Sequence, residues 1–233
     1  MELELSSMLA TWVESSIADD DIVRLKNLKD SPEQAHMVAV RNFLPHESAL
    51  ALAAALNRNV IWSRCLVVST ASGVSCQVSN EEWSTVSGRL RFSRFDVGKL
   101  QSDSNPHVRS VISEFFDFTR STRFLKWINR VTGFQVCELV ESRISRYRPG
   151  DFIVEHRDST DGRSLRLNLY LDPDWKEEDG GILSFRNSSG QTTTVPPTFN
   201  AVAFSPVKLN CVHWVSPLLC ERTGRLSIAL NYR

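Results

Sequence analysis

The sequence lacks a surplus of charge of either sign, and it lacks any paired cysteine motif. Lysine plus arginine and aspartate plus glutamate both number 27, so the formal net charge is zero. Proteins that bind nucleic acid mainly through phosphates usually carry a basic surplus, so a nucleic-acid partner is disfavoured. The five cysteines form no C-x-x-C pair, and an odd number makes a poor disulfide framework. We therefore expect free thiols in a reducing compartment.

The first residues show no pattern typical of a signal peptide, and the sequence has no long apolar run. Its first residues are acidic and do not show a basic stretch followed by an apolar one. No apolar run approaches the roughly 18 residues that would span a bilayer. We expect a cytoplasmic protein without a membrane partner. Hydrophobic residues nevertheless make up 42% of the chain, which is enough for a core that encloses a site.

Residues 1–132 read mostly as helices with a few strands. Helices are expected over residues 1–36, 46–57 and 107–132, and Gly133 is a candidate C-cap for the last one. Strands are expected over residues 37–43, 60–68 and 90–95. The polar stretch from 70 to 87 is expected to be a loop with a short helical piece.

After Gly133 the pattern changes to short alternating runs separated by turn residues. Strands are expected over 135–147, 151–156, 164–171, 182–186, 192–195, 200–205, 211–215 and 225–232. Eight short strands with tight turns favour an antiparallel sandwich or barrel. No repeat or flexible linker divides the chain, so we expect one domain over residues 1–233. In it, residues 1–132 support a β core formed by residues 133–233.

His156, Asp158 and His213 are the candidate metal ligands. Residues two apart on a strand point to the same face, so His156 and Asp158 can converge on one point. His213 lies on a later expected strand and can supply a third ligand. Two histidines and one carboxylate on one face form the facial triad of non-haem iron(II) oxygenases, which leaves positions open for a bidentate 2-oxo acid and dioxygen. Alone, H-x-D recurs by chance, and a surface histidine near an aspartate is the commoner explanation.

Arg225 and Ser227 add to this pattern on the last expected strand. They share one face by the same period of two. A planar guanidinium can hold a carboxylate through two hydrogen bonds, and the hydroxyl can add another. In isolation, Arg225 could equally be a solvated charge on an edge strand.

Together the motifs resemble the prolyl-4-hydroxylase-like branch of the Fe(II)/2-oxoglutarate dioxygenases. The resemblance covers about residues 133–233 and follows the order of motifs in that family. The motifs are Tyr147-x-x-Gly150, His156-x-Asp158, Leu169-Tyr170-Leu171-Asp172, Gly180-Gly181-x-Leu183, His213 and Arg225-x-Ser227.

The resemblance implies a mainly β fold with flanking helices around a double-stranded β-helix (jelly-roll, cupin-like) core. It also implies an enzyme that uses Fe(II), 2-oxoglutarate and O2, with ascorbate as a reductant, and releases succinate. By the same resemblance, His156, Asp158 and His213 bind the iron and act as the catalytic centre. The resemblance assigns co-substrate binding to Arg225, Tyr170, Tyr147 and Ser227. Because Asp158 supplies the carboxylate ligand, hydroxylation is favoured over halogenation.

Arg166 and Asn168 depart from the family pattern. They share a face with Tyr170, where family members often carry smaller or more apolar residues. A charged arginine inside a barrel is costly unless it is paired. One interpretation is an internal ion pair with Asp151, Glu155 or Asp161. The other is recognition of a substrate or co-substrate carboxylate.

For the substrate we expect an amino-acid-like or natural-product small molecule, hydroxylated at an aliphatic carbon, because the domain is compact and the face of Arg166 and Asn168 is polar. A peptidyl or protein proline is the alternative suggested by the family branch. Two readings from other classes are a catalytically silent jelly-roll binding module and a zinc hydrolase. The first is disfavoured by the complete ligand set, and the second leaves Arg225 and Tyr170 unexplained.

Overall fold

A computed structural model describes the backbone of residues 18–30, 37–58, 60–69, 75–86, 91–100, 106–157, 162–207, 212–221 and 224–233. Its helices are α2 (Asp19–Asp30), α3 (His46–Arg58), α4 (Asn80–Thr85), α5 (Pro106–Arg120) and α6 (Thr122–Thr132), with a 3-10 turn at Glu177–Asp179. No helix among these residues is long and apolar enough to cross a membrane.

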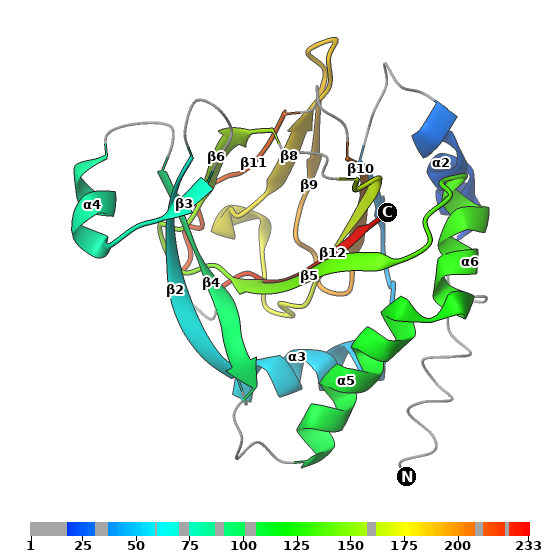
Figure 1. Ribbon diagram of the computed structural model, residues 1–233, viewed down its shortest axis with the longest axis horizontal. Coiled ribbons are helices and arrows are strands. Elements are labelled where there is room, and N and C mark those ends of the chain that lie inside the picture. The colour runs from blue at the N-terminus through cyan, green and yellow to red at the C-terminus, as the bar shows by residue number, and fades with distance from the viewer. Residues whose placement is uncertain are drawn as a thin grey trace.

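The strands form two sheets (Figure 1). The eight-stranded sheet has the order β1-β10-β7-β12-β5-β4-β2-β3, and the four-stranded sheet has the order β6-β11-β8-β9. The first set comprises β1 (Val38–Val40), β2 (Val60–Ser69), β3 (Ser75–Gln77), β4 (Arg91–Leu100), β5 (Leu139–Arg146), β7 (Leu165–Tyr170), β10 (Val202–Pro206) and β12 (Leu226–Tyr232). The second comprises β6 (Ile153–His156), β8 (Leu183–Arg186), β9 (Thr192–Val195) and β11 (Val212–Val215).

All eight strands expected after Gly133 are present, β5 to β12. Four of them, β5, β12, β7 and β10, are neighbours in the larger sheet, and the other four make up the smaller sheet. The chain therefore crosses repeatedly from one sheet to the other, and every pairing is antiparallel. This is the arrangement of a double-stranded β-helix, as the family resemblance implied.

Alternation along β7 and β12 separates two apolar clusters. On β7 the side chains that point toward the helices are those of Leu165, Leu167 and Leu169. They pack with Phe204 and residues of α3, α5 and α6. Tyr170 belongs instead to the cluster between the two sheets, with side chains of β8 and β11. Residues in phase with Tyr170 on β7, and their partners on β12, therefore face the space between the sheets.

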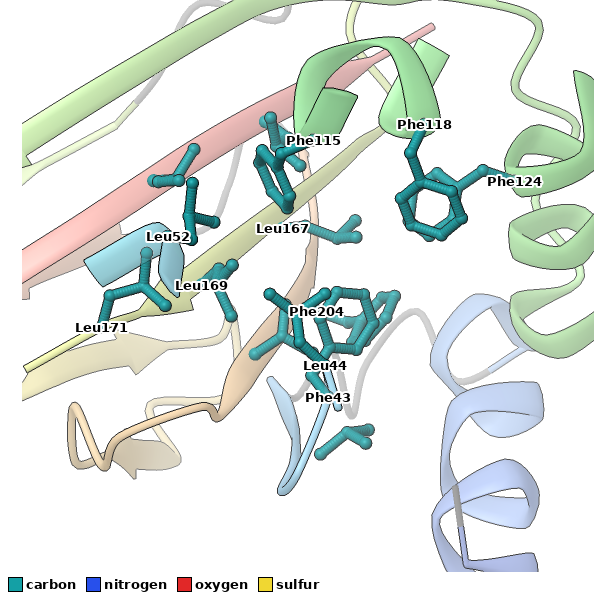
Figure 2. Packing of buried hydrophobic residues seen from close by; sticks show 14 of the residues in the cluster. Phe43, Leu44, Leu52, Phe115, Phe118, Phe124, Leu167, Leu169, Leu171 and Phe204 are labelled. Carbon is teal, nitrogen blue, oxygen red and sulfur yellow. The ribbon is translucent and has the colours of Figure 1, made fainter. Parts of the chain in front are cut away.

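Helices cover the outer face of the larger sheet (Figure 1). Figure 2 shows Phe115 and Phe118 of α5 and Phe124 of α6 turned toward Leu167 and Leu169 of β7. Burying one such aromatic side chain contributes roughly 1.5–3 kcal/mol. This packing holds β7 rigid from behind, and β7 carries several of the predicted site residues on its other face.

The single helix expected over residues 107–132 is two helices. The Ser121 hydroxyl accepts a hydrogen bond from the Phe124 N–H at 3.2 Å and so caps the start of α6. The chain turns at this cap, and both helices can then lay an aromatic face on the sheet. Gly133 ends α6 in the left-handed conformation, with φ of 72°, as predicted.

The larger sheet extends beyond β5 through β4, β2 and β3. The strand β3 and the capped helix α4 lie where the sequence analysis expected a loop with a short helical piece. The extension is tied to the core, because Arg64 of β2 binds Asp151 at 3.1 Å, and β4 also lies against β6. Asp151 is fully buried just before β6.

Candidate active site

His156 of β6 and His213 of β11 lie directly opposite each other in the smaller sheet. Their ring centroids are 4.1 Å apart, with the ring planes inclined at 53°. His213 is in phase with Val215, whose side chain is buried between the two sheets, so the histidine faces the same interior. The structure thus brings together two of the three predicted metal ligands.

Hydrogen bonds indicate which ring nitrogen of each histidine would bind a metal ion. Nδ1 of His156 lies 3.0 Å from the carbonyl oxygen of Val154. A carbonyl can only accept, so Nδ1 is the donor in this contact, and Nε2 is the nitrogen through which His156 would bind a metal ion. Nε2 of His213 lies 3.3 Å from Nη1 of Arg166. A guanidinium can only donate, so this Nε2 also carries a lone pair. In each histidine Nε2 is therefore the nitrogen that would ligate a metal ion, and in His213 it lies against Arg166.

The third expected ligand, Asp158, lies outside the described residues. Within the part of the chain that the structure describes, no group of three or more histidine, cysteine, aspartate or glutamate side chains could hold a metal ion. The assignment of Asp158 stays a prediction.

Arg225 lies between two tyrosine rings, just before the first residue of β12. Its guanidinium carbon is 4.7 Å from the ring centroid of Tyr147 and 5.0 Å from that of Tyr170. All three side chains are buried. Gly181 makes room for the arginine, because a Cβ there would lie 3.0 Å from Cδ of Arg225. In the sequence Gly181 stands out only as part of the Gly180-Gly181-x-Leu183 motif, and no sequence pattern indicates this contact.

The Tyr170 hydroxyl and the Arg225 guanidinium are the buried donors of this pocket. Among the described residues, neither the Tyr170 hydroxyl nor Nε of Arg225 has a hydrogen-bond partner. Burial raises the pKa of Tyr170, and the nearby Arg225 charge opposes this shift only in part, so the hydroxyl keeps its proton. Ser227, buried opposite Tyr170 on β12, lies beside them. A carboxylate is the group that such donors fit, because it only accepts.

Arg166 lies on the interior face of β7 and is almost fully buried. Its Nε donates to Oδ1 of Asn231 at 2.8 Å, and the Asn231 amide donates to Glu141 at 3.0 Å. Arg163 also donates to Glu141, at 3.1 Å. Asn168 is half-buried, two residues along β7 from Arg166.

Asn231 and Glu141 were not among the predicted site residues. Asn231 lies on the same face of the last strand as Arg225 and Ser227, because all three follow the period of two. A polar residue on that face, near the end of an apolar strand, was the signal in the sequence that could have identified it. Of the three acids considered as ion-pair partners of Arg166, Asp151 pairs with Arg64 and Glu155 pairs with Arg186. Asp161 lies outside the described residues.

Comparison with known proteins gives a family match. Residues 4–196 match the family described as oxoglutarate and iron-dependent oxygenase degradation C-term. The chain is 26% identical over 136 residues to the prolyl 3-hydroxylase OGFOD1 of Mus musculus and of Xenopus laevis. This alignment covers 56% of the chain but only 24% and 26% of those proteins, so the chain spans about a quarter of these curated relatives.

Solved structures share the fold at low sequence identity. A Pseudomonas putida prolyl-4-hydroxylase is 19% identical with a TM-score of 0.57, over 97% of this chain and 99% of that one. A Trichoplax adhaerens prolyl hydroxylase, solved with a hypoxia-inducible-factor oxygen degradation domain peptide, is 16% identical with a TM-score of 0.62, over 91% and 90%. These neighbours confirm the double-stranded β-helix that the topology indicates. The family match covers most of the sequence, so the chain belongs to the oxoglutarate- and iron-dependent oxygenases, a family of enzymes.

Proposed function

We propose that this chain is an Fe(II)/2-oxoglutarate-dependent hydroxylase of prolyl residues in a peptide or protein. The observation that carries the proposal is the pairing of two features inside one β-helix. One is the facing pair His156 and His213, whose rings lie 4.1 Å apart on paired strands of the smaller sheet. The other is the buried set of hydrogen-bond donors at Arg225 and Tyr170. A metal ion with a carboxylate co-substrate would use both.

In this proposal His156, Asp158 and His213 hold the iron. When bound, the iron supplies dioxygen-dependent oxidation of an aliphatic carbon, coupled to decarboxylation of 2-oxoglutarate to succinate. The hydrogen bond to Val154 fixes the orientation of the His156 ring.

Arg225 and Tyr170 receive the distal carboxylate of 2-oxoglutarate, and Ser227 adds a hydroxyl. The Tyr147 ring forms the opposite wall and keeps water from the guanidinium, so each charge-assisted hydrogen bond is stronger than it would be in solvent. The pocket is thereby selective for a carboxylate at this position.

The proposed substrate class is based on the names of related proteins and not on contacts seen in the structure. A small molecule was expected from the sequence, whereas several of the relatives found by sequence and by structure are named prolyl hydroxylases, one of them bound to a peptide. The sheet extension of β4, β2 and β3 is consistent with a larger substrate, because it flanks β6, the strand that carries His156.

A small carboxylic acid is the second candidate substrate. The buried guanidinium of Arg166, next to His213, is the observation that favours it. Such a substrate would place its carboxylate on Arg166 and its reacting carbon near the metal.

The proposal is tested by incubating the purified protein with Fe(II), 2-oxoglutarate, ascorbate and air, together with a pool of proline-containing peptides. A separate reaction receives free amino acids and other small carboxylic acids. We expect a peptide to gain one oxygen atom at proline, with succinate formed in equal amount, and no reaction with His213→Ala. Oxidation of a small acid alone would support the second candidate. Absence of coupled succinate in both reactions would contradict both candidates.

A further inference from the structure

Three cross-strand pairs of β7 and β12 line up on the interior face of the larger sheet. They are Tyr170 with Ser227, Asn168 with Ala229 and Arg166 with Asn231. Neighbouring pairs lie roughly 7 Å apart along the strands. The first pair borders the buried guanidinium of Arg225, and the third reaches His213. A molecule that touches both Arg225 and a metal ion on His213 therefore has to pass the middle pair.

The middle pair is the open one of the three. Asn168 is partly accessible, whereas the other five residues of β7 are buried. Yet β7 has a neighbouring strand on each side, and helices cover its outer face. The residues beside Asn168 in register are both alanines, Ala203 on β10 and Ala229 on β12. The accessible surface of Asn168 therefore faces the space between the two sheets.

The side-chain amide of Asn168 is the second feature of the middle pair. Within the described part of the chain, this amide makes no hydrogen bond. The third pair differs, because Nε of Arg166 donates to Oδ1 of Asn231 at 2.8 Å. A side-chain amide carries two N–H donors, and a partly buried amide usually finds a partner for them. The donors of Asn168 are thus available to a ligand that reaches the middle pair.

The length of 2-oxoglutarate matches the distance from the first pair to the middle one. Its carboxylate carbons end a chain of four carbon–carbon bonds, which spans roughly 5 Å when extended. One step between pairs is roughly 7 Å, and two steps are roughly 13 Å. A distal carboxylate at Tyr170 and Arg225 therefore places the 2-oxo acid end nearest to Asn168 and Ala229.

The two alanines beside Asn168 differ in their surroundings. Ala203 packs in the apolar cluster between the sheets, together with Tyr170 and Phe185. Ala229 is buried but belongs to neither apolar cluster of the described residues. Apolar side chains thus occupy the β10 side of Asn168. The β12 side, which continues from the distal carboxylate site at Arg225, is the side left for a ligand.

We propose that the Asn168 amide donates a hydrogen bond to the carboxylate next to the oxo group of 2-oxoglutarate, and that this end of the co-substrate lies over Ala229. The inference rests on the proposed function. Asn168 orients the end of the co-substrate that ligates the metal ion, while Arg225 holds the other end. At Asn168, the polarity that suggested a small-molecule substrate then serves the co-substrate.

The test compares two ligands by isothermal titration calorimetry on the full chain saturated with Mn(II), without oxidation. 2-Oxoglutarate carries both carboxylates, and 2-oxobutanoate carries only the one next to the oxo group. Asn168→Ala removes the donors without adding bulk, so the affinity for both ligands should fall by about 10-fold or more, as for a lost hydrogen bond to a charged group. Arg225→Leu should weaken the binding of 2-oxoglutarate and leave that of 2-oxobutanoate unchanged.

Two valine variants test on which side of Asn168 the co-substrate lies. Ala229→Val fills the proposed space, so the affinity for both ligands should fall by about 10-fold or more. Ala203→Val is the matched control on the other side, where apolar side chains already pack. It should lower stability and leave both affinities unchanged. Equal weakening of ligand binding by the two valines would overturn the placement over Ala229.

Urea unfolding separates a binding role of Asn168 from a structural one. Asn168→Ala loses no hydrogen bond within the described residues, so its free energy of unfolding should stay level. Unchanged affinities in this variant, or a loss of affinity for 2-oxoglutarate alone, would overturn the assignment to the 2-oxo acid end. If this variant does not fold, Ala229→Val carries the test. If the wild type with Mn(II) does not bind 2-oxoglutarate, the proposed function itself fails.

Discussion

The backbones of Gly224 and Tyr147 lie in contact: a Cβ on Gly224 would stand 1.9 Å from the carbonyl oxygen of Tyr147. Gly224 also has φ of 82°, which favours glycine. It directly precedes Arg225, whose carbonyl accepts the Tyr147 N–H at 2.9 Å. Gly224→Ala should lower the free energy of unfolding by about 1–2 kcal/mol for the backbone conformation and about 1–3 kcal/mol more for the clash. Urea unfolding measures the total decrease in the free energy of unfolding.

Gly190→Ala is the matched control for this prediction. Gly190 has φ of 85°, and a Cβ there would meet nothing within 4 Å. This variant should show the conformational cost alone, about 1–2 kcal/mol. Equal decreases in the free energy of unfolding of the two variants would mean that the close contact between Gly224 and Tyr147 does not affect stability.

Removing a tyrosine hydroxyl should have opposite effects at two buried positions. In Tyr170→Phe, the lost hydroxyl has no partner among the described residues, so unfolding free energy should stay level or rise while 2-oxoglutarate affinity falls. In Tyr232→Phe, the lost hydroxyl donates to the Thr119 carbonyl at 3.1 Å, so stability should fall by about 1 kcal/mol and affinity should hold. For both variants, urea unfolding measures the stability, and calorimetry with Mn(II) measures the affinity for 2-oxoglutarate. A stability loss in Tyr170→Phe without an affinity loss would remove Tyr170 from the site.

Arg225→Ala should raise the concentration of 2-oxoglutarate needed for half-maximal turnover by roughly 30- to 5,000-fold, because truncating a desolvated charge partner costs about 2–5 kcal/mol. Arg225→Lys should recover only part of this, since a point charge does not reproduce the planar fork. Arg186→Ala, which removes an arginine from the outer surface, should leave the requirement unchanged. An unaltered requirement in Arg225→Ala would assign the distal carboxylate to another cation.

The strand positions were predictable because alternation and turn residues mark each strand locally. All eight strands after Gly133 lie within a few residues of their expected limits. The break at Ser121 was harder to predict, because apolar spacing continues across it and only the local cap stops the first helix. The strand β3 was missed because Ser75–Gln77 is short and polar, and its pairing with β2 is a tertiary contact. That the whole chain forms one domain stays a prediction.

The interior face of the site was also predictable, since Arg166, Asn168 and Tyr170 share a phase on one strand. The residues of other strands that contact this face were not predictable. The contact between Arg166 and His213 joins two strands of different sheets, and no local pattern specifies it. The same holds for Asn231, which reaches Arg166 only because β12 and β7 are neighbours in that register. Sequence patterns gave phase along each strand, and the fold decided which faces meet.

The most direct test of the account is anaerobic addition of 2-oxoglutarate to the Fe(II)-loaded protein, followed by visible absorption. The account predicts a weak charge-transfer band that appears only when both Fe(II) and 2-oxoglutarate are present, because the 2-oxo acid ligates the iron. The band should be absent in His213→Ala and should need far more 2-oxoglutarate in Arg225→Ala. Absence of the band in the folded wild-type protein, or its persistence in His213→Ala with full iron occupancy, would contradict the proposed site.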